Sequence, residues 1–257
     1  MSHTVETVQL KPDTLIAFDD YIRQAETSVS QSLSGGLPFL WSDRDPGRAR
    51  KVSEGLALSQ LWQGKRPVNV PDGMIHDWIG ALRIAGATLG QVLTLIQDYD
   101  NHKLVYKPEV LDSKLVSRTG DDFRIFLRLM KKKIITVILD TDHDVHYGLL
   151  DPARAWCRSA TTRIAEVDDA GKPSEKISAP DTGYGFLWRL NSYWSFQERD
   201  SGVIVECRAI SLTRNIPKAL KWIIEPIVDK LPRESLRATL EATRRALSPP
   251  PAPANNL

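Results

Sequence analysis

The chain has 257 residues, of which 42% are hydrophobic and 26% charged, and this composition is that of a globular protein with a substantial core. Its net charge of +2 argues against a nucleic-acid partner, because the one basic run, at residues 131–133, also fits a solvated turn between apolar segments. No stretch approaches the roughly 20 apolar residues that span a bilayer, and the start lacks the apolar region of a signal peptide, so we expect a soluble, cytoplasmic protein.

The first part of the chain predicts a helix followed by two short strands. Apolar residues recur at helical spacing from Leu15 to Leu33, with Asp13 as the N-cap and glycines ending the run. Strands are expected at 37–42 and 52–62, because the Pro-Gly pair between them indicates a turn. Residues 1–65 are therefore interpreted as an N-terminal extension, residues 66–247 as the main domain and residues 248–257 as a disordered tail.

The main domain begins with a strand and a short helix. The strand is predicted over 75–85, and Thr88 with Gln91 three residues later forms a capping box for the helix that follows. A series of strands comes next, joined by links so short that neighbours must pair antiparallel. These strands are predicted over 110–118, 122–131, 133–148 and 154–168, and a final hairpin over 185–199 and 201–213.

Alternation along these strands predicts one apolar face. In the last strand, Val205 and Cys207 lie opposite Glu206 and Arg208, and we expect the neighbouring aromatic residues to join the apolar side. The aromatic residues assigned to that side are Phe186, Trp188, Trp194 and Phe196. A packed aromatic core explains this pattern, but the small residues beside the rings also leave room for a cavity. Cys157 and Cys207 are interpreted as core residues, since two cysteines are too few for a disulfide framework or zinc site.

A long helical stretch from 216 to 247 is predicted to cover the apolar face. Asn215 is its expected N-cap, and Pro226 and Pro232 must kink or divide it. The segment 217–230 is then either a lid that opens or a static kink that fits the helix to the sheet.

The order of strand, short helix, antiparallel strands and long C-terminal helix resembles the START-like helix-grip superfamily, also called SRPBCC. The resemblance covers about residues 70–247, and its best local matches are Gly86-Ala87-Thr88-Leu89, the segment 98–110 and Trp194-Ser195-Phe196 before Gly202. It implies an α+β fold in which a curved antiparallel sheet wraps around the C-terminal helix. Relatives include coenzyme Q-binding, lipid-transfer and polyketide cyclase/dehydratase-like proteins, and the chain is most similar to bacterial members for which no ligand is implied.

The resemblance and the apolar face together favour binding, or transport, of a hydrophobic small molecule or lipid in an internal cavity. We expect no cofactor, no metal and no catalytic residue, while transient membrane contact, export of a processed form and the oligomeric state stay open. The residues expected to line the cavity are Tyr99, Ile125, Leu127, Trp188, Trp194, Phe196, Val205, Cys207, Ile223, Ile227, Leu236 and Leu240.

Two other functions are weighed against the carrier hypothesis. A cyclase, aromatase or hydrolase acting on a polyketide-like or other apolar substrate would use inward polar residues such as His143, Tyr147 or Tyr99, and should bring them together in one pocket. An interaction module would bind another protein through the extension. A row of acidic residues with one histidine, at 140, 142, 144 and 146, shares one strand face and could meet a metal, but an exposed polar face explains it better.

Overall fold

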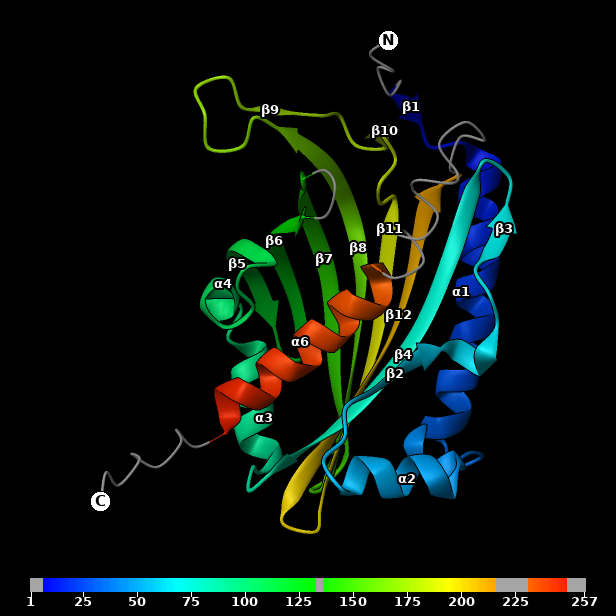
Figure 1. The fold of residues 1–257 in the computed structure, drawn as a ribbon, viewed down its shortest axis with the longest axis vertical. Helices are drawn as coiled ribbons and strands as arrows, with labels where there is room; N and C mark the ends of the chain where they lie inside the picture. Colours follow the sequence, from blue (N-terminus) through cyan, green and yellow to red (C-terminus); the bar gives the residue numbers. More distant parts are fainter. Residues whose placement is uncertain (1–6, 133–135, 216–230, 249–257) are drawn as a thin grey trace, which may run out of the picture.

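The computed structural model describes residues 7–132, 136–215 and 231–248, and its centre is one large antiparallel sheet. The sheet order is β2-β4-β12-β11-β8-β7-β6-β5, with β3 also paired to β4 and β9 to β8 (Figure 1). Its strands are β2 (Leu58–Leu61), β3 (Val68–Val70), β4 (Gly73–Ala85), β5 (Val110–Thr119), β6 (Asp122–Lys132), β7 (Thr136–Asp151), β8 (Arg154–Asp168), β9 (Lys176–Ile177), β11 (Arg189–Arg199) and β12 (Gly202–Arg214). A separate small ladder joins β1 (Val8–Gln9) to β10 (Thr182–Gly183).

Tight turns set the register of the central hairpins. Asp200 and Ser201, between β11 and β12, both have positive φ, at 51° and 55°, as a two-residue turn matched to strand twist requires. The following strand, β12, then pairs along its whole length with β4, so the chain's first long strand lies beside its last. The long strands β4 to β8, β11 and β12 were predicted with ends close to those observed. The large antiparallel sheet with a C-terminal helix confirms the predicted α+β helix-grip architecture.

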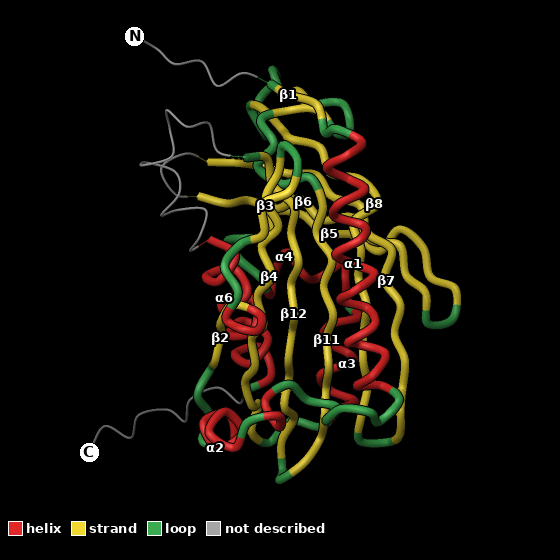
Figure 2. The backbone as a smooth tube through the Cα atoms, turned by 90° about the vertical axis from the view of Figure 1, so that its right-hand side faces the viewer, coloured by secondary structure: helices red, strands yellow, loops and turns green. Residues whose placement is uncertain are grey.

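Helices cover both faces of the sheet, which Figure 2 shows from the side. The C-terminal helix α6 (Leu231–Leu247) and the N-terminal helix α1 (Pro12–Leu33) lie on opposite sides of β4, β12 and β11. We call the side of α6 the inner face and the side of α1 the outer face. Since both are covered, β4 and β12 are buried along most of their length rather than on alternate residues.

The inner face is closed by α6 and by α3 (Leu89–Gln97). Thr88 and Gln91 form the predicted capping box at the start of α3, which turns Leu89, Val92 and Ile96 into the inner core. Helix α6 packs closely over Gly80, where an added Cβ would lie 2.7 Å from Cδ1 of Leu240. Glycine at this position therefore allows direct contact between helix and sheet.

The outer face is covered by the N-terminal extension. Phe18 and Ile22 of α1 pack with Ile75, Ile210 and Leu212 from the sheet. A second outer cluster joins segment 39–41, Val52 and Trp62 to the strands β4 and β12. The extension thus supplies the third layer of the protein.

Two predictions for the extension are wrong. The strand expected at 37–42 is absent, and the chain forms a 3-10 turn (Ser42–Arg44) and the helix α2 (Pro46–Ser53) where a turn and strand were predicted. The cause is Asp45, whose side chain accepts a hydrogen bond from the Arg48 N–H while Pro46 occupies the first helical position. Of the strand 52–62, only β2 forms.

The ends of the two long helices also differ from expectation. Lys11, not Asp13, is the N-cap of α1, because Pro12 already begins the helix and places Asp13 in its first turn. The predicted lid at 217–230, with Pro226, lies outside the described residues, as does the tail from 249 onward. Among the described helices, none is long and apolar enough to cross a bilayer.

Candidate functional site

The inner face brings together most of the residues predicted to line a cavity. One buried cluster contains seven of them, namely Tyr99, Ile125, Phe196, Val205, Cys207, Leu236 and Leu240. Leu127 and Trp194 are partly buried and pack against that cluster. Ile223 and Ile227 lie outside the described residues.

Trp188 does not belong to this face. Its side chain is buried in the outer cluster, beside Tyr193 and the apolar residues of β12. The alternation that placed Trp188 with Phe196 fails because β11 begins only at Arg189, so strand geometry does not extend back to Trp188. Its backbone N–H still bonds to the Leu212 carbonyl at 2.7 Å, which fixes it next to the sheet.

Trp194 lies at the centre of the inner face, between two small side chains. Its partners across the sheet are Cys157 on β8 and Cys207 on β12, both buried. The indole ring stacks on Phe196 with centroids 6.1 Å apart, and its Nε1 donates to Ser192 Oγ at 3.2 Å. Despite this central position, Trp194 is only partly buried.

Burial also raises the pKa of both cysteine thiols, that of Cys157 to about 12, so both stay protonated at neutral pH. A buried, protonated thiol is a poor nucleophile. Cys157 and Cys207 therefore act here as small apolar residues, and the prediction that both are core residues is confirmed.

Two tyrosines meet inside the inner cluster. The hydroxyls of Tyr99 and Tyr147 lie 2.6 Å apart, and Tyr147 also donates to the Ile96 carbonyl at 3.3 Å. Both rings pack edge-on against Phe123. Burial raises the pKa of both hydroxyls above the ordinary value for tyrosine, so the pair stays neutral.

His143 is a separate polar group on the same face. One ring nitrogen lies 2.9 Å from Thr141 Oγ1 and the other 3.3 Å from Ser159 Oγ, so neighbouring hydroxyls occupy both. Burial lowers the pKa of His143 to about 4, which keeps the ring neutral at physiological pH. His143 and the tyrosine pair share the inner face, but each makes its hydrogen bonds with a different set of neighbours.

Two further polar side chains of the inner face come from β4, and the sequence pattern did not identify them as functional. His76 is fully buried and bonds through Nε2 to Thr213 Oγ1 at 3.3 Å, while its Nδ1 finds no partner within the described residues. Trp78, 8% exposed, likewise has an indole Nε1 without a partner there. The signal was the alternation of β4, which places both on the face of Gly80 and Leu82.

The outer face holds a buried ion pair between Asp77 on β4 and Arg208 on β12. Arg208 donates to both carboxylate oxygens of Asp77, at 3.0 Å through Nε and 2.6 Å through Nη2. Tyr21 of α1 donates to the same carboxylate at 2.8 Å, and the guanidinium lies 3.9 Å from the ring centre of Trp62. The extension thus provides both a hydrogen bond and an aromatic cover for this pair.

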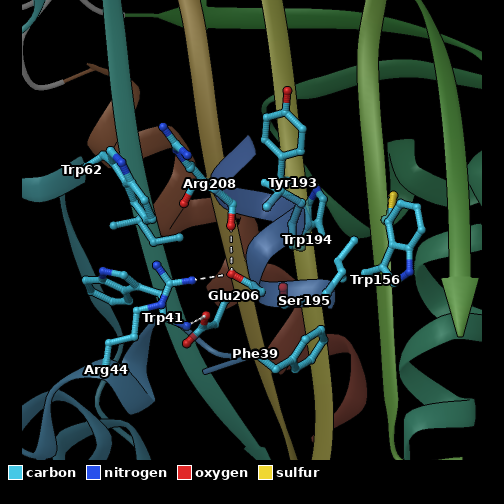
Figure 3. A pocket seen from close by; sticks show the side chains of 16 residues that line it. Phe39, Trp41, Arg44, Trp62, Trp156, Tyr193, Trp194, Ser195, Glu206 and Arg208 are labelled. Atoms are coloured by element: carbon cyan, nitrogen blue, oxygen red, sulfur yellow. Dashed lines mark hydrogen bonds between the residues drawn. The ribbon is translucent and has the colours of Figure 1, made fainter. Parts of the chain in front are cut away.

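A small pocket of about 50 Å³ lies between this face and the extension (Figure 3). Glu206 faces it from β12 and accepts hydrogen bonds from the Trp41 and Ser42 N–H groups, at 2.6 and 2.8 Å. Burial raises the pKa of Glu206, against the lowering effect of these two bonds. Arg44 enters from the other side and donates to Ser32 Oγ at 2.6 Å. This space fits one or two water molecules and is too small for a lipid.

The acidic row on β7 forms ion pairs and hydrogen bonds across the sheet. The pairs are Arg128–Asp140, Arg163–Asp142, Arg124–Asp144 and His146–Asp122. Within the described ranges, no group of three or more potential ligands is arranged to hold a metal ion. The row is therefore explained by pairing between neighbouring strands.

No family model matches the sequence, and no curated protein matches it. Among solved structures, the chain is similar to the following three. A STAR-related lipid transfer protein fragment from Xanthomonas axonopodis is 17% identical, covers 71% of this chain and 97% of its own, and has a TM-score of 0.48. Human STARD10 is 9% identical, and the match covers 77% of this chain and 79% of STARD10, with a TM-score of 0.44. The Zhui aromatase/cyclase from a Streptomyces species is 11% identical, and the match covers 67% of this chain and 96% of the aromatase/cyclase, with a TM-score of 0.41.

Proposed function

We propose that this protein binds an apolar small molecule or lipid between the inner face of the sheet and α6. The observation that carries the proposal is the partial exposure of side chains at the middle of that face. Trp194 and Ala209 both lie on central strands and point inward, yet neither is fully buried. In a filled core, side chains at such positions would be covered on every side.

The surroundings of this exposed surface suit an apolar ligand. Phe196, Val205 and Cys207 beside it are buried and carry no charge. Each 100 Å² of apolar ligand surface removed from water would contribute about 2.5 kcal/mol before the costs of association. A molecule that covers Trp194 and Ala209 would therefore gain most of its affinity from burial.

Catalysis by a cyclase-type enzyme in the same space is the alternative. It would need a polar group free to exchange a proton with a substrate. Tyr99 and Tyr147 bond to each other, and both nitrogens of His143 have hydroxyl partners, so these groups stabilise the inner face in its present form. These contacts support binding over catalysis.

Titration with the uncharged fluorescent probe N-phenyl-1-naphthylamine tests the proposal, since its emission rises in an apolar environment. The wild-type protein should give a saturable rise at one probe per chain. An Ala209→Leu substitution should occupy the space beside Trp194 that the probe needs and weaken binding about tenfold, a change of about 1.4 kcal/mol.

The matched control is Thr162→Leu, which adds an apolar side chain at an exposed position on β8. It should leave the affinity unchanged, and circular dichroism should show that both variants are folded. The proposal is wrong if the wild-type protein gives no saturable binding, or if Ala209→Leu and Thr162→Leu bind the probe as well as the wild type does.

A further inference from the structure

Two buried polar atoms on the inner face of β4 have no hydrogen-bond partner among the described residues. They are Nδ1 of His76, a residue with no exposed surface, and Nε1 of Trp78, which is 8% exposed. A polar atom left unpaired in an apolar environment costs about 1–3 kcal/mol. Two such atoms on one face therefore call for a partner that the described protein does not supply.

Both nitrogens are covered by the surrounding protein, so a ligand must displace side chains to reach them. His76 and Trp78 are two positions apart on one strand, so their side chains share a face. Their partners across β12 are small, Ser211 opposite His76 and Ala209 opposite Trp78. Ala209 is the side chain that remains partly exposed, so Trp78 borders the surface assigned above to the ligand.

The chemistry of the two atoms defines what they can bind. An indole N–H only donates a hydrogen bond. Neutral imidazole has one donor and one acceptor, and because a hydroxyl such as that of Thr213 can fill either role toward Nε2, Nδ1 can be either. A ligand oxygen would therefore accept from Trp78, and would either accept from, or donate to, His76.

We propose that His76 and Trp78 recognise an uncharged oxygen, a hydroxyl or a ketone carbonyl, on the apolar ligand of the inner face. The inference rests on the proposed function and narrows it from any apolar molecule to one with a single neutral polar group. The described polar side chains nearest in register, Ser192, Ser211 and Thr213, are uncharged, so they offer no ion-pair partner to a charged headgroup.

The test compares 1-octanol, 2-octanone and octane as competitors of N-phenyl-1-naphthylamine on the full chain. Trp78→Phe removes the N–H and keeps an aromatic ring. It should weaken the binding of octanol and octanone about three- to tenfold, the value of one neutral hydrogen bond, and leave the affinity for octane unchanged. His76→Leu, an independent variant, should likewise weaken at least one of the two oxygenated competitors and not octane. If only octanol loses affinity, the ligand oxygen is a hydroxyl. If octanol and octanone both lose affinity, a ketone carbonyl is also recognised.

The matched control is Trp194→Phe, since the Trp194 N–H already donates to Ser192. It should change the affinities of octanol and octane by the same factor. If the probe and octane bind but neither Trp78→Phe nor His76→Leu changes octanol or octanone relative to octane, polar recognition is refuted while the proposed function stands. If neither the probe nor octane binds the wild type, the proposed function fails and this inference fails with it.

Discussion

The buried pair of Asp77 and Arg208 gives the sharpest prediction about how the outer face is held together. Both side chains are 7% exposed, and the carboxylate accepts from Tyr21 as well as from the guanidinium. We consider Asp77→Leu, Arg208→Met and the double variant. Each single change leaves one buried charge without its partner, whereas the double change replaces both charges with apolar side chains.

The magnitudes follow from burial. Removing one partner of a buried ion pair costs about 3–5 kcal/mol, while replacing the whole pair by apolar residues is often neutral. In the double variant the Tyr21 hydroxyl loses its acceptor, which costs about 1–3 kcal/mol. The double variant should thus be more stable than either single variant, with a coupling free energy of several kcal/mol between the two positions.

Urea unfolding followed by circular dichroism measures these free energies. The control is the cross-strand pair Arg124–Asp144, whose side chains are 72% and 58% exposed and whose coupling should not exceed about 1 kcal/mol. Equal coupling in the two pairs, or a double variant whose loss equals the sum of its single losses, would refute the reasoning.

Two further predictions concern the inner face and acid stability. Gly80→Val should destabilise the protein by about 1–3 kcal/mol in urea, because its side chain overlaps α6, while Gly90→Ala, with nothing within 4 Å, should change stability by less than about 1 kcal/mol. Burial lowers the pKa of His76, His102 and His143 to about 4, so below about pH 6.5 the unfolded chain takes up protons that the folded protein does not. The free energy of unfolding should therefore fall from about pH 6.5 down to about pH 4, approaching about 1.4 kcal/mol per pH unit for each histidine, and urea midpoints that do not move between pH 7 and pH 5 would contradict this.

Local sequence signals predicted the long strands of the sheet and the helix α3 well. The Thr88–Gln91 capping box, the turn at 199–202 and the alternation around Cys207 each act over a few residues, and each appears in the structure. The order of these elements was enough to indicate a helix-grip fold. Alternation along the strands also placed most of the residues predicted to line a cavity on one face.

The outer face could not be predicted in this way, because its burial depends on residues distant in sequence. Glu206 and Arg208 alternate with apolar residues as an exposed polar face would, but α1 and segment 39–44 cover them. The helix α2 is a different case, because its N-cap contact between Asp45 and the Arg48 N–H is local, and Asp45 followed by Pro46 is itself a helix-start signal. Nor does alternation show whether the nitrogens of a buried histidine or tryptophan find partners.

The most direct test of ligand binding on the inner face is a crystal structure of the protein grown with 1-octanol. The chain should hold one alcohol molecule between α6 and the sheet, with its alkyl chain over Trp194 and Ala209 and its oxygen within hydrogen-bond distance of Trp78 Nε1. Side chains that close over Ala209 and Trp194 with no alcohol beside them would contradict the central claim.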